Sequence, residues 1–211
     1  MSSEAHAPVR MPPFHVYRDF LAPEDHQRLV AWAIAHEADF APSQVYGGRH
    51  DADRRSSASL RSAAGTSWRA PIEARVDALA PSLFADAGVA PFDLRVKELE
   101  MVAYNDGGRF KPHIDVLTGA ARHARGDRVL SGVYYFHREP KHFSGGALRL
   151  FAFGVEGDDV FVDVPPEQNS FVLFPSWVRH EVREVACPSK AFADSRFAVN
   201  CWLYRPASAA G

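Results

Sequence analysis

The spacing of apolar residues along the chain changes near Pro91, from a helical period to an alternating one. Residues 22–40 carry apolar side chains every three or four positions, with Pro23 and acidic residues at the start, which predicts an amphipathic helix. Residues 70–84 repeat this spacing and predict a second helix, which Pro81 is expected to end or to kink.

Downstream of Pro91, short runs of β-branched and aromatic residues alternate with glycine, proline and aspartate, a pattern typical of strands and turns. The predicted strands are Leu94–Tyr104, Val129–Phe136, Ala147–Phe153, Asp159–Val164, Ser170–Phe174, Glu181–Val185 and Arg196–Tyr204. Many short strands at this spacing indicate a sandwich or a barrel. We interpret the chain as one domain over residues 1–211, with a helical flank and loops in residues 1–90 and a β-core in residues 91–205.

The composition narrows the class of protein. The 211 residues are 46% hydrophobic and 24% charged, as in a globular domain with a sizeable core. No stretch has the length and apolar purity of a membrane span, and the N-terminus lacks the apolar segment of a secretory signal, so we expect a cytoplasmic protein without a membrane partner. A net charge of −2 provides no general attraction for nucleic acid. Cys187 and Cys201 are too few for a disulfide framework and are interpreted as reduced, structural residues.

Two segments are basic, rich in small residues and poor in large apolar ones: Gly47–Ser62 and Ala121–Arg128. Both are predicted to be loops. One interpretation is solvated loop surface, which is what most runs of charge form. The other is a pair of flaps that flank the mouth of a site and order when a substrate binds.

The stretch "YNDGGRFKPHIDV", residues 104–116, combines a tight turn with metal-binding side chains. Its glycine pair permits a chain reversal, and Pro112 biases the residue before it toward extended geometry. His113 and Asp115 then share a face, because alternate residues of an extended chain point the same way. An imidazole and a carboxylate at this spacing form two thirds of a metal site, although short polar residues also gather in turns by chance.

Two further residues stand out in the strand-rich half. His180 ends "SFVLFPSWVRH", where a bend between two predicted strands can return an imidazole to the sheet, whereas the other histidines lie in helices, loops or turns. Arg196 opens "RFAVNCW" among apolar neighbours. A buried arginine requires an anionic partner, unless it lies on an edge strand and its head reaches water.

Taken together, the motifs "YNDGGRFKPHID", "LSGVYYFHRE", "SGGALRLF", "VLFPSWVRHEV" and "RFAVNCW" resemble, in order, the catalytic half of the Fe(II)/2-oxoglutarate-dependent oxygenases. The likeness is strongest to the prolyl-hydroxylase-like branch and covers roughly Leu94–Tyr204. It implies a double-stranded β-helix, the jelly roll shared with cupins.

The resemblance implies that His113, Asp115 and His180 are the iron ligands. Two imidazoles and one carboxylate on one face of Fe(II) leave three positions open for the cosubstrate and for oxygen. The related halogenases lack this carboxylate and bind halide in its place. Asp115 therefore favours hydroxylation, or another oxidation, over halogenation.

The resemblance also implies residues around the cosubstrate. Arg196 and Tyr135 would hold the distal carboxylate of 2-oxoglutarate, and Tyr104 would lie beside the cosubstrate. Trp202 would face the substrate. The interval between the last predicted iron ligand and Arg196 is longer than usual in the family, which leaves Arg183 as the alternative arginine.

The expected activity is hydroxylation of a C–H bond in a peptidyl or amino-acid substrate, with release of succinate and carbon dioxide. The expected cofactors are Fe(II), 2-oxoglutarate and O2, with ascorbate in support. The expected partner is a peptide, protein or amino-acid-like substrate and not a nucleic acid, because nucleic-acid demethylases of the superfamily carry a further arginine where this chain has Trp202. The alternatives are a biosynthetic hydroxylase of small molecules and, in another class, a non-catalytic cupin-like metal-binding or sensor module.

Overall fold

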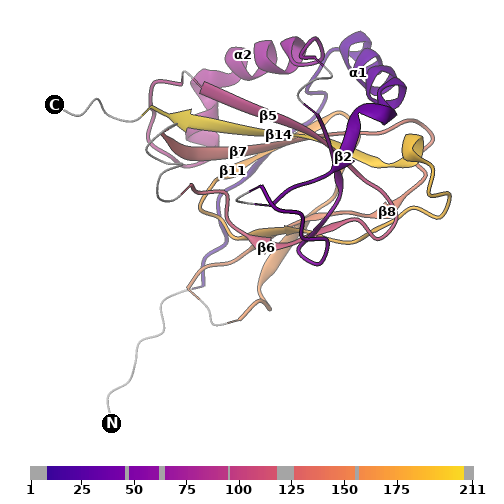
Figure 1. Cartoon of the computed structure of the whole chain (residues 1–211). Helices are drawn as coiled ribbons and strands as arrows, with labels where there is room; N and C mark the ends of the chain where they lie inside the picture. Colours follow the sequence, from indigo (N-terminus) through magenta and orange to yellow (C-terminus); the bar gives the residue numbers. More distant parts are fainter. Residues whose placement is uncertain are drawn as a thin grey trace.

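The computed structural model describes residues 9–45, 48–61, 65–94, 96–117, 126–154 and 157–206. Two β-sheets lie face to face, and two helices cover the outer face of the larger sheet (Figure 1). The helices are α1, Pro23–Ala35, and α2, Ala70–Asp86, with short 3-10 turns at Glu37–Asp39 and Phe192–Asp194. None of the helices in the described part of the chain is long and apolar enough to cross a membrane.

The sheets are antiparallel and their strand order is far from sequential. The large sheet has the order β1-β11-β7-β14-β5-β4-β2, the small sheet β10-β9-β12-β6-β3, and β13 pairs with β8. The strands of the large sheet are β1 His15–Tyr17, β2 Phe40–Pro42, β4 Ala58–Leu60, β5 Val96–Tyr104, β7 Asp127–Phe136, β11 Ser170–Pro175 and β14 Arg196–Arg205. The remaining strands are β3 Arg55–Ser56, β6 Arg109–His113, β8 Ser144–Gly145, β9 Leu148–Phe151, β10 Phe161–Val164, β12 His180–Val182 and β13 Val185–Ala186.

Alternation along the long strands gives the large sheet two apolar faces. Phe197, Val199 and Cys201 of β14 belong to the core cluster that contains the buried faces of both helices. Ala198, between them, belongs to a second cluster with residues of the small sheet, as Tyr135 of β7 does. Because successive side chains of a strand point to opposite faces, one strand supplies both clusters. The second cluster lies between the two sheets, where the candidate site is found.

The fold class predicted from the sequence is confirmed, and the predicted strands are present with one change. Their ends shift by one or two residues, except that the predicted strand Glu181–Val185 is two short strands, β12 and β13. The pairing changes partner between them: Arg183 donates its backbone N–H to Ala147, and Val185 pairs with Gly145. The chain therefore passes from the small sheet to the β13–β8 pair within one predicted strand.

Pro81 does not end the second helix, and whether it kinks the helix stays a prediction. Helix α2 continues through it to Asp86. The carbonyl that loses its hydrogen bond is that of Asp77, and Asp77 and Pro81 are both exposed, so water can replace the missing donor. Buried residues on both sides, such as Val76 and Leu83, keep the helix packed on the sheet.

The first predicted helix is also shorter than expected. Helix α1 ends at Ala35, and residues 40–42 form β2 instead. The ring of Phe40 lies 4.9 Å from that of Phe192 and 6.5 Å from that of Phe197, so packing on the sheet overrides helical propensity there. The sequence pattern predicted no strands in residues 1–90, yet this part of the chain supplies strands to both sheets.

Candidate active site

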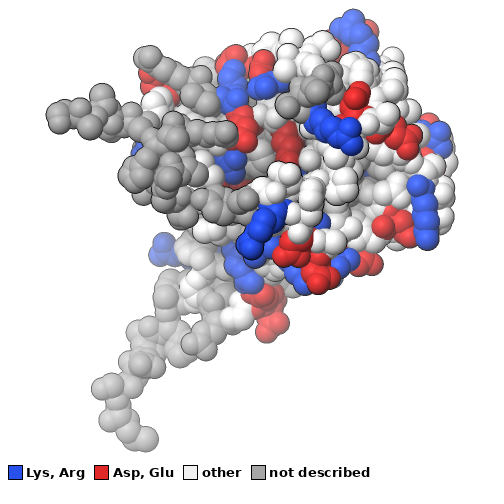
Figure 2. All heavy atoms as spheres, viewed as in Figure 1, with Lys and Arg blue, Asp and Glu red and all other residues white. Residues whose placement is uncertain are grey.

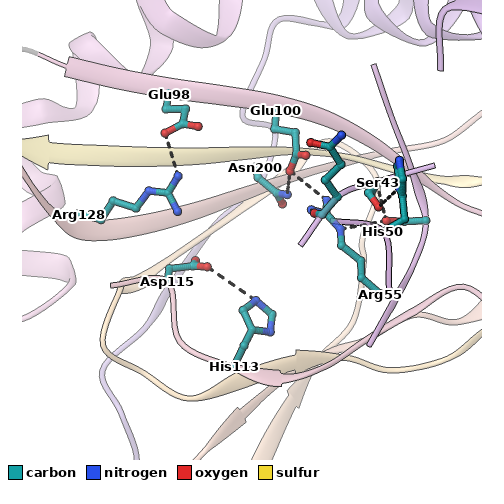
Figure 3. A network of polar contacts seen from close by, with 11 residues as sticks. Ser43, His50, Arg55, Glu98, Glu100, His113, Asp115, Arg128 and Asn200 are labelled. Carbon is teal, nitrogen blue, oxygen red and sulfur yellow. Dashed lines mark hydrogen bonds and ion pairs between the residues drawn. The ribbon is translucent and has the colours of Figure 1, made fainter. Parts of the chain in front are cut away.

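Three potential metal ligands converge between the sheets. His113 ends β6, Asp115 follows two residues later, and His180 begins β12. One ligand atom from each residue lies within 4.8 Å of the others, and the Asp115 carboxylate is 3.7 Å from Nε2 of each histidine. His113 and His180 are direct cross-strand partners, so the pairing of β6 with β12 brings the two imidazoles together. Figure 3 shows His113 and Asp115 facing each other in this region.

A β-bulge in β6 turns His113 toward the site. Phe110 pairs with Val182 and His113 pairs with His180, so three steps along β6 match two along β12. The extra residue puts Phe110 and His113 on the same side of the strand, where their rings stack with centroids 3.7 Å apart. Pro112 lies within the bulge and has no N–H to offer to the ladder.

Both histidines are held in the tautomer that a metal requires. Nδ1 of His113 lies 2.9 Å from the carbonyl oxygen of Lys111, and Nδ1 of His180 lies 2.9 Å from that of Val178. A carbonyl oxygen only accepts, so each Nδ1 carries the proton and donates it. In the neutral ring, Nε2 then has the lone pair, and this atom lies toward the carboxylate.

The Asp115 carboxylate is fixed by its neighbours and stays ionised. Ser131 donates its hydroxyl to Oδ2 at 2.7 Å, and the Asp115 backbone N–H donates to the carbonyl of Ser176 at 3.0 Å. Burial by itself would raise the pKa of Asp115, but the nearby imidazoles and the hydrogen bonds from Ser131 and Trp202 lower it below its usual value. Burial, followed by the adjacent His180, lowers the pKa of His113 to about 3. An ionised carboxylate beside a neutral imidazole is the state that binds a cation.

Arg196 presents unpaired donors at the other end of the same pocket. Its side chain is 1% exposed, and Nε donates to the carbonyl oxygen of Gly146 at 2.9 Å. Among the described residues, neither Nη1 nor Nη2 has a hydrogen-bond partner, and the same is true of the buried Tyr135 hydroxyl. Burial raises the pKa of that hydroxyl to about 12, against the effect of the nearby guanidinium, so it stays protonated and can donate. Such a buried cation is costly without an anion, and two nitrogens in a fork fit a carboxylate.

One cavity connects this arginine to the metal cluster. Its lining includes Arg196 and Tyr104 together with His113, Asp115 and His180. The rings of Tyr104 and Tyr135 lie 4.9 Å and 4.7 Å from the Arg196 guanidinium carbon. Arg183, the alternative from the sequence, is half-exposed, bonds to Glu181 at 3.1 Å, and is absent from the described lining of this cavity. The geometry therefore favours Arg196 as the anion-binding arginine.

A wider hollow of about 720 Å³ opens outward from this cavity. Trp202 forms part of its wall, and the Arg128 guanidinium lies 4.2 Å above the indole ring. Glu98 pairs with Arg128 and Glu100 pairs with Arg55, so two neutralised ion pairs line the hollow (Figure 3). Figure 2 shows basic and acidic side chains interspersed over the face in view.

The first basic segment contributes to the hollow and the second lies mostly outside the described residues. Arg49, Asp51, Arg54 and Arg55 line the hollow, so part of Gly47–Ser62 borders the site, although β3 and β4 within this segment are strands and not loop. Residues 121–125 are not described. Whether either segment orders on binding a substrate stays a prediction.

The sequence reasoning did not identify Arg55, Ser131 or Asn200, which all lie at the site. A signal existed for two of them. Ser131 shares its strand face with Tyr135, and Asn200 shares its face with Arg196 and Trp202, so extending the alternation along β7 and β14 finds both. Arg55 lies in a two-residue strand within a charged segment and had no periodic signal.

Comparisons with known proteins agree with this geometry. Residues 99–204 match the model of the 2OG-Fe(II) oxygenase superfamily. An uncharacterized PKHD-type hydroxylase from Synechocystis sp. is 34% identical over 191 residues, which cover 88% of this chain, and the chain spans 61% of that relative's length.

Two solved structures show the same fold. A prolyl-4-hydroxylase from Pseudomonas putida has a TM-score of 0.66 at 21% identity, over 93% of this chain and 94% of that one. A Trichoplax adhaerens prolyl hydroxylase, in complex with a peptide of the hypoxia inducible factor oxygen degradation domain, has a TM-score of 0.66 at 16% identity, over 91% and 83%. With the family model matching half of its residues, this double-stranded β-helix chain belongs to the 2OG-Fe(II) oxygenase superfamily.

Proposed function

We propose that the chain is an Fe(II)- and 2-oxoglutarate-dependent dioxygenase that hydroxylates a C–H bond of a peptidyl or amino-acid substrate. The observation that supports this most directly is the shared cavity, which has a His113–Asp115–His180 cluster at one end and the unpaired Arg196 fork at the other. 2-Oxoglutarate matches this arrangement, because its keto acid group can bind a metal ion at the cluster while its other carboxylate pairs with Arg196.

His113, Asp115 and His180 would hold the iron. Three protein ligands on one side leave room for the cosubstrate and for oxygen, which a closed set of protein ligands would not. Iron and 2-oxoglutarate bound there would supply oxygen activation, with succinate and carbon dioxide as the products of the cosubstrate. The protein contributes geometry: the Nδ1 hydrogen bonds aim both Nε2 lone pairs, and Ser131 orients the carboxylate.

Arg196 and Tyr135 would bind the distal carboxylate of 2-oxoglutarate. The guanidinium offers two donors in the fork that matches a carboxylate, and the tyrosine hydroxyl offers a third. Both groups are almost fully buried, so the charged hydrogen bonds form out of contact with water. Tyr104 closes the same end of the pocket with its ring.

The peptidyl class of substrate is supported by the relatives and by the volume of the hollow. The Trichoplax adhaerens structure contains a peptide, and the curated relative is named as a hydroxylase. In this chain the hollow of about 720 Å³ is lined by two residues of the cluster, His113 and Asp115. A residue within a peptide can enter it while its neighbours stay outside. The intact ligand set and the unpaired arginine count against a non-catalytic sensor module.

The proposal can be tested by incubating the protein with Fe(II), ascorbate, 2-oxoglutarate and a library of peptides and free amino acids. Mass spectrometry is expected to find one substrate that gains a single oxygen atom, with succinate formed in equal amount. His180→Ala should abolish both signals. Oxidation of a free amino acid alone would assign the chain to small-molecule hydroxylation, and a protein that binds neither iron nor 2-oxoglutarate would refute the proposal.

A further inference from the structure

Five residues line both the inner cavity and the outer hollow and therefore form the neck between them. They are Arg55, Phe110, His113, Asp115 and Trp202. Four of them lie within the part of the chain that matches the superfamily model, and Arg55 lies outside it. Its side chain is buried, with 8% exposed. None of the motifs shared with the family includes Arg55, so its role at the neck must be inferred from its contacts.

The Arg55 guanidinium is held in one plane by three hydrogen bonds. Nε donates to the Ser57 hydroxyl at 3.1 Å, Nη1 donates to the carbonyl of Gln44 at 3.1 Å, and Nη2 donates to Glu100 at 3.0 Å. The same oxygen of Glu100 accepts from Asn200 at 3.1 Å, which fixes the carboxylate in turn (Figure 3). The Glu100 charge offsets that of Arg55, so the pair adds little net charge beside the metal cluster.

The fixed Arg55 guanidinium lies beside the ring of Phe110, which in turn stacks on the candidate metal ligand His113. Arg55 and Phe110 are direct cross-strand partners of β3 and β6, and the guanidinium carbon lies 5.1 Å from the Phe110 ring centroid. The Phe110 ring stacks on His113 at 3.7 Å with an angle of 21° between the ring planes. The Nδ1 hydrogen bond restrains one edge of the His113 imidazole, and Phe110 restrains its face.

We propose that Arg55 is a positioning residue for His113 and acts through Phe110. The inference rests on the proposed metal-binding function and adds a residue from the N-terminal third to the site. Without the flat, immobilised guanidinium, the Phe110 ring gains freedom, and the imidazole that stacks on it loses its fixed orientation. Outer partners that orient a metal ligand typically change metal affinity by about 10–100-fold.

The test measures metal affinity in a double-mutant cycle of Arg55→Lys, Phe110→Leu and both together. Lysine keeps the positive charge beside Glu100 but lacks the plane and the fork, so the electrostatic contribution to metal binding is retained. Leucine keeps an apolar side chain and removes the flat ring. Anaerobic calorimetric titration with Fe(II), repeated with Co(II), gives each affinity, and metal-free melting temperatures report folding. Arg61→Lys is the matched control, since Arg61 is exposed and lies outside the described lining of both cavities.

Arg55→Lys is expected to weaken metal binding roughly tenfold. If Arg55 acts through Phe110, the double variant should bind no more weakly than the weaker single variant, because neighbours in one chain of contacts are not additive. Arg61→Lys should bind like the wild type. Wild-type affinity in Arg55→Lys, or fully additive losses in the double variant, would overturn the inference.

Two further outcomes are also decisive. A wild-type protein that binds neither metal ion would overturn the proposed function, and the inference with it. If Arg55→Lys does not fold, Arg55→Gln in a Glu100→Gln background replaces it, because this pair of changes removes both charges together. Unchanged metal affinity in that background, measured against Glu100→Gln alone, would refute the role of Arg55.

Discussion

At the scale of single residues, Arg196 is the candidate for binding the anionic cosubstrate. We expect Arg196→Ala to weaken 2-oxoglutarate binding by one to two orders of magnitude, since a hydrogen bond to a charged group contributes about 1.5–3 kcal/mol. Metal binding should survive, because Arg196 lies at the far end of the cavity from the cluster. Arg196→Lys should restore only part of the affinity, as lysine lacks the fork. Calorimetric titration with 2-oxoglutarate gives these affinities.

Arg183→Ala is the control for this experiment, since Arg183 is half-exposed and already paired with Glu181. It should bind 2-oxoglutarate like the wild type. Loss of cosubstrate binding in Arg183→Ala, with full binding in Arg196→Ala, would contradict the assignment.

His180 provides a second test at this scale. His180→Ala removes one of three ligands and should lower metal affinity by more than the ~10–100-fold typical of an outer partner. The exposed His142 supplies the comparison, because His142→Ala changes a histidine away from the cluster. Anaerobic titration with Fe(II) measures both. A His180→Ala protein that keeps its affinity would show that the metal binds elsewhere.

At the scale of elements, the turn between β8 and β9 packs against the Arg196 side chain. Gly146 has a φ of +70°, and a Cβ added there would approach Cδ of Arg196 at 2.8 Å and a methyl of Val185 at 2.9 Å. Its carbonyl also accepts the Arg196 Nε hydrogen bond. Gly146→Ala should therefore displace the guanidinium and weaken 2-oxoglutarate binding while metal affinity is kept, as titration with each ligand would show.

Gly157 offers a control with the same kind of backbone strain. Its φ is +88°, and the nearest atom to an added Cβ is 4.0 Å away. Gly157→Ala should cost stability without affecting 2-oxoglutarate. Equal affinities for the cosubstrate in both variants would mean that the Gly146 turn does not position Arg196.

How far each element could be predicted depended on its length and on its surroundings. β5, β7 and β14 have nine or ten residues, enough for the alternation to appear in the sequence. β3 has two residues and carries no period, so the approach of Arg55 to the site is a tertiary effect. The β-bulge in β6 was equally hidden: the sequence gives an extended chain at Pro112, but only the pairing with β12 shows the extra residue.

The convergence of the candidate ligands was predictable for a different reason. His113 and Asp115 are two residues apart, and local geometry brings them to one side. His180 comes from a distant strand, and only the resemblance to a family linked it to them. Pro81 shows the opposite case, because the local rule allowed it to end the helix and the packed helix nevertheless continues to Asp86.

At the scale of the whole molecule, acid should destabilise the metal-free protein. The pKa of His113 is lowered to about 3, and burial lowers the pKa of His26 and of His137 as well. In the unfolded chain these imidazoles return to about 6.5, so the unfolded state binds more protons below that pH and stability falls as the pH drops from about 6.5 toward 3. Each fully shifted group contributes at most roughly 1.4 kcal/mol per pH unit.

Urea denaturation at pH 7 and pH 5, with a chelator present, measures this loss. His26→Asn should make it smaller, because one of the buried imidazoles is removed. Equal stability at the two pH values, or greater stability at pH 5, would contradict the pKa shifts.

The place of β14 in the large sheet also determines when the protein can fold. Among the described strands β14 comes last in sequence, yet it lies between β7 and β5 in the middle of the sheet. During synthesis the two halves of the large sheet therefore have no common partner until β14, Arg196–Arg205, has left the ribosome. Pairings between such distant segments form slowly, and the unpaired edges of β5 and β7 are open to other chains meanwhile. The large sheet is thus expected to close only once β14 is available, after a period in which the nascent chain depends on protection from aggregation.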